Sequence, residues 1–399
     1  MQATRIHDWA VRILAVVLLG ATGCGNGDDH TLTIGVLAPL DAGLTQFGRG
    51  IRNSVQVAVD EANDAHVLPG WKIRVVAVDD SSDPAVGLHN VERLLHDSTV
   101  IGVVGTYNSG VAAAVLPDLE AAGIALVSPG NTNPALTLGD DRDHPVRPYG
   151  NYFRMVAHDG QQGGFLGGRA RQLGHHEAAI VTDDKPVSQG LANDFRSAFV
   201  GAGGTVVSFE VVPDGDTDYR PFAEHAAAKN PDLLFFGGEY DHAALLKQDA
   251  VAAGLAVPLM GGDGVQADQY VAAVGAGADG DLASSVGAPV EDEPGGAAFL
   301  ASYEARGFDD APSTFGPYAY DAANILIAAA SGALANHPRI DEATRAVIVE
   351  RIQAITNADL VNPNGTVTGE IGFDAFGDTL HPALTLYRVD DGAWTPLEN

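Results

Sequence analysis

Three short polar segments of this chain follow apolar runs and carry side chains that could bind a small charged solute. The hydroxyls of Ser109 and Thr132 could donate hydrogen bonds to a carboxylate, helped by the first backbone N–H groups of a helix expected from Val111. Asp263 could accept hydrogen bonds from an ammonium group. Together these groups would hold a zwitterion. The segments are Val103-Val104-Gly105-Thr106-Tyr107-Asn108-Ser109, Ser128-Pro129-Gly130-Asn131-Thr132-Asn133-Pro134 and Met260-Gly261-Gly262-Asp263-Gly264.

The elements that must position these groups alternate between strand and helix patterns. β-branched and apolar runs predict strands, and apolar residues at helical spacing, such as Ile51, Val55 and Ala62, predict helices between them. The alternation favours an α/β fold with a doubly wound parallel sheet, where ligands bind outside the carboxyl ends of the strands. Ser, Pro, Gly and Asn are also ordinary turn residues, so composition alone does not make the second segment a site. The first strands are expected at 31–36, 71–78, 100–104 and 124–127.

A second series of the same kind follows a charged, proline-containing interruption at 140–149. Strands at 178–182, 205–211, 233–236 and 258–261 alternate with helices, so we predict a second doubly wound unit. Further helices are expected at 296–306, 318–334 and 342–355, and late strands at 371–374 and 384–387.

Length and charge limit the classes of function. The chain has 399 residues and 46% hydrophobic content, so two domains are expected. The formal net charge of -30 would repel the phosphates of nucleic acids and anionic lipid headgroups. Neither nucleic acid nor a charged membrane surface is therefore expected as a partner.

The first 24 residues have the pattern of an export signal. Basic residues precede an apolar segment, Ile13 to Leu19, that is too short to span a bilayer, and small residues then lead to Cys24, the only cysteine. Ala21-Thr22-Gly23-Cys24 resembles a lipobox, which predicts lipidation of Cys24 and a tether at 25–30. The alternative is a plain secretory signal cleaved near Ala21. Both interpretations predict an exported protein.

Motifs of catalysis and of cofactor or metal binding are missing from the sequence. There is no P-loop, no Gly-x-Gly-x-x-Gly directly after a strand, and no nucleophile-elbow pattern around Ser109 or Ser188. Asp79, Asp80 and Asp83 lack the spacing of an EF-hand loop, so we interpret them as a turn and helix cap. No enzyme activity, cofactor or metal is expected.

Several segments together resemble the branched-chain amino-acid (Leu/Ile/Val) binding proteins of ABC transporters. The similarity runs in order from about Thr31 to the C-terminus. It rests on the Ser128 to Pro134 segment together with Gln46-Phe47-Gly48, Val78-Asp79-Asp80, Phe236-Gly237-Gly238, Ala252-Ala253-Gly254-Leu255 and Met260-Gly261-Gly262-Asp263-Gly264-Val265. The resemblance implies a type I periplasmic-binding-protein fold, a Venus-flytrap of two Rossmann-like lobes joined by three crossover strands. Lobe one would hold 31–152 and 285–359, and lobe two 153–284 and 360–399.

The resemblance also assigns the site. Ser109, Gly130 and Thr132, with Asn131 in the same turn, would bind the α-carboxylate, and Asp263 would pair with the α-ammonium where the family usually has Glu. Val187 and Glu239 stand where the family often has tyrosines. Glu239 either lines the pocket and favours a cationic solute, or points to solvent and pairs with Lys247 or His242. The apolar wall is assigned to Phe47, Tyr107 and Tyr318.

The function implied is that of a lipid-anchored, monomeric solute-binding subunit of an ABC importer. It would capture an amino acid or related small polar solute between lobes that close on it, and then dock on permease and ATPase subunits. The alternative is a receptor that uses the same two lobes to sense a ligand without transport.

Overall fold

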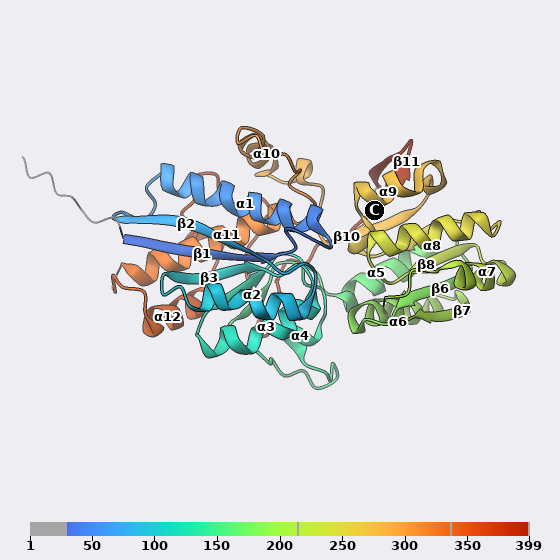
Figure 1. The fold of residues 1–399 in the computed structure, drawn as a ribbon, viewed down its shortest axis with the longest axis horizontal. Helices are drawn as coiled ribbons and strands as arrows, with labels where there is room; N and C mark the ends of the chain where they lie inside the picture. The colour runs from blue at the N-terminus through green and yellow to red at the C-terminus, as the bar shows by residue number, and fades with distance from the viewer. Residues whose placement is uncertain (1–29, 214, 336, 398–399) are drawn as a thin grey trace, which may run out of the picture.

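The computed structural model describes residues 30–213, 215–335 and 337–397. Two bodies, each built on one sheet, lie side by side, and the chain passes between them three times (Figure 1). The predicted signal segment, Cys24 and the tether up to residue 29 lie outside the described residues. Within the described part of the chain, no helix combines the length and apolar character that crossing a membrane requires.

The first body is built on five parallel strands in the order β2-β1-β3-β4-β5. Successive side chains of β1 point to opposite faces, so Ile34 and Val36 join one core and Leu37 the other. The strands are β1 (His30–Ala38), β2 (Trp71–Asp79), β3 (Val100–Gly105), β4 (Ala125–Ser128) and β5 (Tyr152–Arg154). One face is covered by α1 (Thr45–Asp64), α11 (Gly316–Leu334) and α12 (Glu342–Gln353), with α10 (Gly296–Glu304) packed on α1, and the other face by α2 (Pro84–Leu95), α3 (Ser109–Ala121) and α4 (Ala135–Leu138).

The second body is built on seven strands in the order β12-β11-β10-β9-β8-β6-β7, of which β11 is antiparallel to both its neighbours. The strands are β6 (Glu177–Asp183), β7 (Thr205–Val212), β8 (Leu233–Phe236), β9 (Leu259–Gly261), β10 (Leu282–Ser285), β11 (Thr385–Asp390) and β12 (Ala393–Leu397). One face packs against α7 (Arg220–Lys229), α8 (Tyr240–Ala252) and α9 (Asp268–Val274), and the other against α5 (Asp159–Gln172) and α6 (Pro186–Gly201). Short 3-10 helices are η1 (Asp263–Val265), η2 (Gly275–Ala278), η3 (Val290–Asp292) and η4 (Asn357–Asp359).

The five strands of the first sheet and the parallel strands β6 to β10 of the second have the same order. The second strand of each series lies on one side of the first, and the third, fourth and fifth lie on the other. Such a reversal leaves a crevice at the carboxyl ends of the strands, where ligands of open α/β sheets bind. The predicted α/β fold with two doubly wound units is confirmed.

Helices α5 and α6 pack closely because glycines face the contact. A Cβ atom added to Gly163 would lie 2.5 Å from the Cβ of Asp194, and one added to Gly167 would lie 2.6 Å from the backbone nitrogen of Phe199. Only a residue without a side chain fits at such distances. Gly163 and Gly167 therefore serve the packing of these two helices.

Several details differ from the sequence prediction, and the short helices α4 and α9 are among the elements that were not predicted. The segment 371–374 forms no strand, only an isolated bridge between Phe373 and Thr379, while β5, β10 and β12 were not predicted. Ile371 and Phe373 pack into the core of the first body. The sequence predicted that the chain enters lobe two after residue 359, but the chain joins the second sheet only at β11.

Asp83 accepts hydrogen bonds from the N–H groups of Ala85 and Val86, so the helix-cap interpretation is confirmed.

Candidate ligand-binding site

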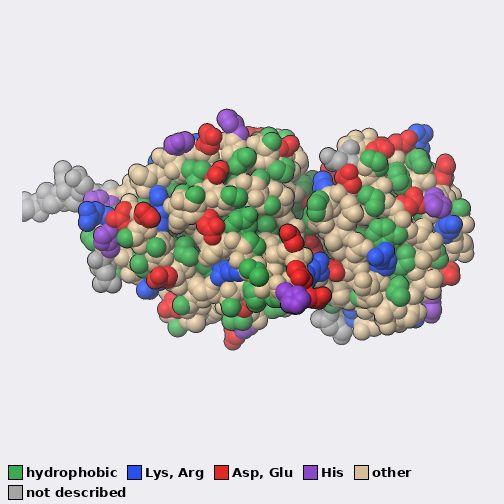
Figure 2. All heavy atoms as spheres, turned by 90° about the horizontal axis from the view of Figure 1, so that it is seen from below, with side chains coloured by type: hydrophobic (Ala, Val, Ile, Leu, Met, Phe, Trp, Pro, Cys, Tyr) green, Lys and Arg blue, Asp and Glu red, His purple; other side chains and the backbone are tan. Residues whose placement is uncertain are grey.

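A cavity of about 560 Å³ lies between the two bodies, lined by loops that follow the strands of both sheets. The first body contributes the segments after β3 and β4, and the second those after β6, β8 and β9. Figure 2 shows the furrow between the bodies on one face of the molecule, with acidic side chains gathered at its edge. Seven of the ten predicted binding residues line the cavity: Tyr107, Ser109, Gly130, Thr132, Val187, Glu239 and Asp263.

The first body presents hydrogen-bond donors to the cavity. Ser109 begins α3, and its Oγ accepts from the backbone N–H groups of Thr132 (3.3 Å) and Asn133 (3.2 Å). This arrangement leaves the Ser109 hydroxyl hydrogen free to donate. The first N–H groups of an α-helix have no partner within the helix and carry partial positive charge. The start of α3, with the Thr132 hydroxyl, therefore suits a carboxylate.

Asn131 holds this turn in place but does not line the cavity. Its side chain is fully buried, and its Nδ2 donates to the carbonyl oxygens of Thr106 (3.0 Å) and Tyr107 (2.8 Å). Ser128 Oγ accepts from the Asn131 N–H (2.8 Å). The sequence analysis placed Asn131 among the ligand contacts. In the structure its side-chain amide instead donates hydrogen bonds to the neighbouring loop.

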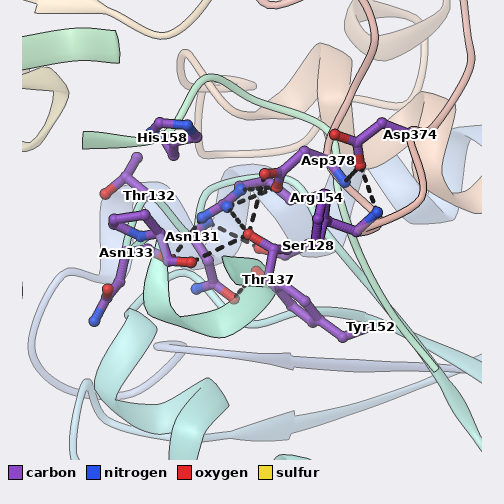
Figure 3. Close-up of polar contacts among 12 residues, drawn as sticks. Ser128, Asn131, Thr132, Asn133, Thr137, Tyr152, Arg154, His158, Asp374 and Asp378 are labelled. Atoms are coloured by element: carbon purple, nitrogen blue, oxygen red, sulfur yellow. Dashed lines mark hydrogen bonds and ion pairs between the residues drawn. The ribbon is translucent and has the colours of Figure 1, made fainter. Parts of the chain in front are cut away.

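An ion pair between Arg154 and Asp378 holds the same turn in place (Figure 3). Arg154, fully buried at the end of β5, donates from Nε to Asp378 Oδ1 (2.8 Å) and from Nη1 to the carbonyl oxygen of Asn133 (2.7 Å). Thr137 Oγ1 donates to Asp378 Oδ2 (3.1 Å) and also contacts Arg154. This Arg154 network joins the ligand-facing turn to two of the segments by which the chain passes between the bodies.

The second body presents carboxylates to the cavity. Asp263 is buried, and a fully buried glutamine, Gln162, orients it: Gln162 Nε2 donates to Asp263 Oδ1 (2.7 Å) and Gln162 Oε1 accepts from the Asp263 N–H (2.9 Å). Ser284 also donates to Gln162 Oε1 (2.9 Å). Burial raises the pKa of Asp263 to about 6, although the Gln162 hydrogen bond lowers it. One carboxylate oxygen remains available to a ligand cation.

Glu239 points into the cavity, which decides between the two interpretations of this residue. Its Oε2 accepts from the Tyr107 hydroxyl (3.0 Å) across the cleft. Lys247 pairs instead with Asp281 (2.6 Å), and His242 with the Tyr219 hydroxyl (2.7 Å). Burial raises the pKa of Glu239 to about 8, and the Asp263 carboxylate adds to the rise. The solvent-facing alternative is wrong.

Asp159, at the start of α5, lines the cavity and was missed by the sequence reasoning. Its side chain is only 2% exposed, and its backbone N–H donates to the carbonyl oxygen of Thr132 (2.8 Å). Burial and the Asp263 carboxylate raise its pKa to about 7, although a hydrogen bond with the Thr132 side chain lowers it. An acidic residue in a first helical turn is common for helix stability alone, so the sequence carried no distinct signal for it.

Two of the predicted wall aromatics lie elsewhere. Phe47 is fully buried behind Tyr107, with ring centroids 4.7 Å apart, and supports it without lining the cavity. Tyr318 lies near Gly287 and lines a separate small pocket with Met155 and Phe373. Both residues start helical segments whose apolar faces enter the core of the first body. Tyr107 alone of the three lines the main cavity.

This geometry defines a class: two α/β lobes with a polar ligand cavity between them. The periplasmic binding protein family model matches residues 31–393, and the chain belongs to that family. A Leu/Ile/Val-binding protein homolog 2 of Brucella abortus is 28% identical over 379 residues, covering 94% of this chain and 93% of the relative. An amino acid binding protein of Pseudomonas aeruginosa is 28% identical over 382 residues, covering 95% and 96%.

Solved structures agree on the fold. LivJ from Streptococcus pneumoniae, a branched-chain amino acid transporter substrate binding protein in complex with isoleucine, superposes with a TM-score of 0.76 at 24% identity, covering 92% of this chain and all of that one. A solute binding protein of R. palustris in complex with benzoate gives 0.74 at 23% identity, covering 92% and 95%. The resemblance to the branched-chain amino-acid binding proteins is confirmed, while the two ligands show that this fold serves different chemistry.

Proposed function

We propose that this protein captures an amino acid between its lobes as the extracytoplasmic solute-binding subunit of an ABC importer. One observation carries the proposal: carboxylate-binding donors on one lobe and carboxylates suited to an ammonium group on the other line a single cavity. The α-carboxylate would bind at Ser109, Gly130 and Thr132, and the α-ammonium at Asp263. Because these groups belong to different lobes, the ligand stabilises the closed arrangement.

Delivery would involve permease and ATPase subunits on a membrane to which Cys24 attaches this chain through lipid. The family and the lipobox-like residues before Cys24 support this part of the proposal. Mass spectrometry of the mature N-terminus, expressed in a bacterial host, tests the anchor. A diacylglyceryl-modified Cys24 supports it, and an unmodified N-terminus near residue 22 indicates a plain secretory signal.

Calorimetric titration tests the binding function. The protein is freed of bound solute by unfolding and refolding, checked by circular dichroism, and titrated with the L-amino acids one by one. We expect saturable one-to-one binding of at least one amino acid, weakened about thirtyfold or more by Asp263→Asn, because a buried charge loses its partner.

The matched control is Asp218→Asn, which removes a carboxylate from an exposed ion pair with Arg220 outside the cavity. Its affinity should equal that of the wild type. Absence of binding by every L-amino acid in a folded sample, or an unchanged affinity in Asp263→Asn, would contradict the proposed function.

A further inference from the structure

The cavity is lined by more carboxyl groups than one ammonium group can pair with. Four acidic residues line it: Asp184 is exposed, whereas Asp159, Glu239 and Asp263 are buried or half-buried. Lys185 is the only lysine, arginine or histidine among its described lining residues. The Lys185 side chain is 48% exposed and lies 3.8 Å from Asp183. Arg154, the nearest buried guanidinium to the turn, is engaged by Asp378 and the carbonyl oxygen of Asn133.

One carboxyl oxygen of Asp159 has no hydrogen-bond partner within the part of the protein that the structure describes, so it is open to a group of the ligand. Among the described residues, its Oδ2 is buried and has no hydrogen-bond partner, although its side chain is 98% removed from solvent. Buried polar atoms are nearly always paired, and an unpaired buried carboxylate is costly. A neutral amino acid brings one ammonium and one carboxylate, and the donors at α3 bind the carboxylate. A neutral amino acid would therefore leave two of the three carboxyl groups of Asp159, Glu239 and Asp263 without a cation.

The three carboxyl groups are spread along the cavity. Asp159 adjoins Thr132 through its backbone hydrogen bond, whereas Glu239 lies against Tyr107 and the backbone of Gly264. Asp263 influences the pKa of both. In the described part of the chain, no group of three or more His, Cys, Asp or Glu side chains could hold a metal ion. A ligand with separated cationic nitrogens fits this spread.

The remaining wall suits the carbon chain between two such nitrogens. Pro84, Val111, Pro186, Val187 and Leu191 supply apolar surface. Methylene stems pack against apolar surface while their charged ends reach polar groups. At Val187 no aromatic ring shortens the cavity, whose volume exceeds that of a single small side chain.

We propose that the site selects L-amino acids whose side chain ends in a second cationic nitrogen, as in lysine or ornithine. The inference rests on the proposed function and names its ligand class. The α-ammonium lies between Asp159 and Asp263 beside Thr132, and the side-chain nitrogen meets Glu239, which then exchanges part of its contact with Tyr107 for the ligand.

Matched ligand pairs test this directly by calorimetry on the solute-free full chain. L-lysine and L-norleucine share one carbon chain and differ in the terminal ammonium, and L-ornithine and L-norvaline form a shorter pair. We expect the cationic member of at least one pair to bind at least tenfold more tightly. Glu239→Gln should weaken that member about thirtyfold or more and the neutral member little, whereas Asp218→Asn should change neither.

The outcomes separate the two proposals. If the neutral member of each pair binds as tightly as the cationic one, or leucine binds and no cationic amino acid does, the inference is overturned and the amino-acid function stands. If no L-amino acid binds to the folded protein, both are overturned. The ligand comparison in the wild type decides the question even if Glu239→Gln fails to fold.

Discussion

Glu239 lies just before α8 and accepts a hydrogen bond from Tyr107 across the cleft. Tyr107, Asp263, Lys185 and Asp241 are the titratable groups that face it. Among them only Lys185 favours its ionised form by charge, so burial and like charge keep its pKa near 8. A tyrosine at this position would carry no charge. The carboxyl group makes both ligand affinity and folding stability depend on pH.

Glu239→Gln should change how the stability of the ligand-free protein depends on pH. The folded protein holds the Glu239 proton up to about pH 8, whereas the unfolded chain releases it near 4.5. Between these values the folded state binds more protons, so its stability falls as pH rises. The variant, compared with wild type, should therefore gain about 2 kcal/mol between pH 4.5 and 8.5, after allowance for solvent screening.

Urea unfolding at both pH values, with ligand removed, measures this gain. Asp218→Asn is the control, because the pKa of that carboxyl is lowered by Arg220 and its loss should bring no gain at high pH. A stability difference between Glu239→Gln and wild type that is the same at pH 4.5 and 8.5 would show that the Glu239 proton is not held by the fold.

Seven of the ten binding residues predicted from the sequence line the cavity, but the sequence did not indicate which buried polar groups face inward. Ser109, Thr132 and Asp263 follow strands, and their position after a strand predicts their place. Asn131 sits in the same turn, yet its amide satisfies backbone carbonyl groups, and Asp159 comes to the cavity only through the path of the chain between the lobes. The orientation of Asn131 and the position of Asp159 depend on tertiary contacts, which a local sequence pattern does not encode.

At the scale of elements, long strands and helices were predictable because their apolar periodicity is repeated several times. The missed strands β5, β10 and β12 are too short for a periodic signal, and their sequences YFR, LASS and AWTPL lack the continuous apolar run that made the equally short β8, LLFF, predictable. The segment 371–374 has a strand-like composition, but Phe373 packs on Phe153, with ring centroids 5.1 Å apart, and its backbone meets no sheet edge. Its apolar residues serve the core instead.

The Arg154 network is the element-scale link between the turn at Thr132 and the connections between the lobes. Asp378→Ala should destabilise the protein by about 3–5 kcal/mol, because it leaves the fully buried Arg154 guanidinium without its carboxylate. The double variant Arg154→Met with Asp378→Ala should be less destabilised than the sum of the single changes. Urea unfolding of the four proteins gives both values, and additive effects would contradict a coupled pair.

At the scale of the molecule, direct contacts join the lobes away from the chain connections. Tyr107 donates to Glu239 across the cleft, and the ring centroids of Phe47 and Tyr240 lie 5.8 Å apart. Arg142 pairs with Asp194 (2.9 Å) at the edge of the cleft, and Thr314 donates to Gln266 (2.5 Å) on another side. Partly exposed pairs of this kind contribute little to stability. A ligand that bonds to donors on one lobe and carboxylates on the other adds contacts that exist only in the closed form, and it shifts the balance towards that form.

Small-angle X-ray scattering of the solute-free protein, with and without a saturating amino acid identified by calorimetry, tests this account most directly. Asp263→Asn at the same ligand concentration serves as the unbound reference. We predict that the radius of gyration of the wild type falls on binding, because the ligand joins the two lobes, and that the variant stays at the solute-free value. An unchanged radius in the wild type under proven saturation would contradict the claim that the ligand is held by closure of the cleft.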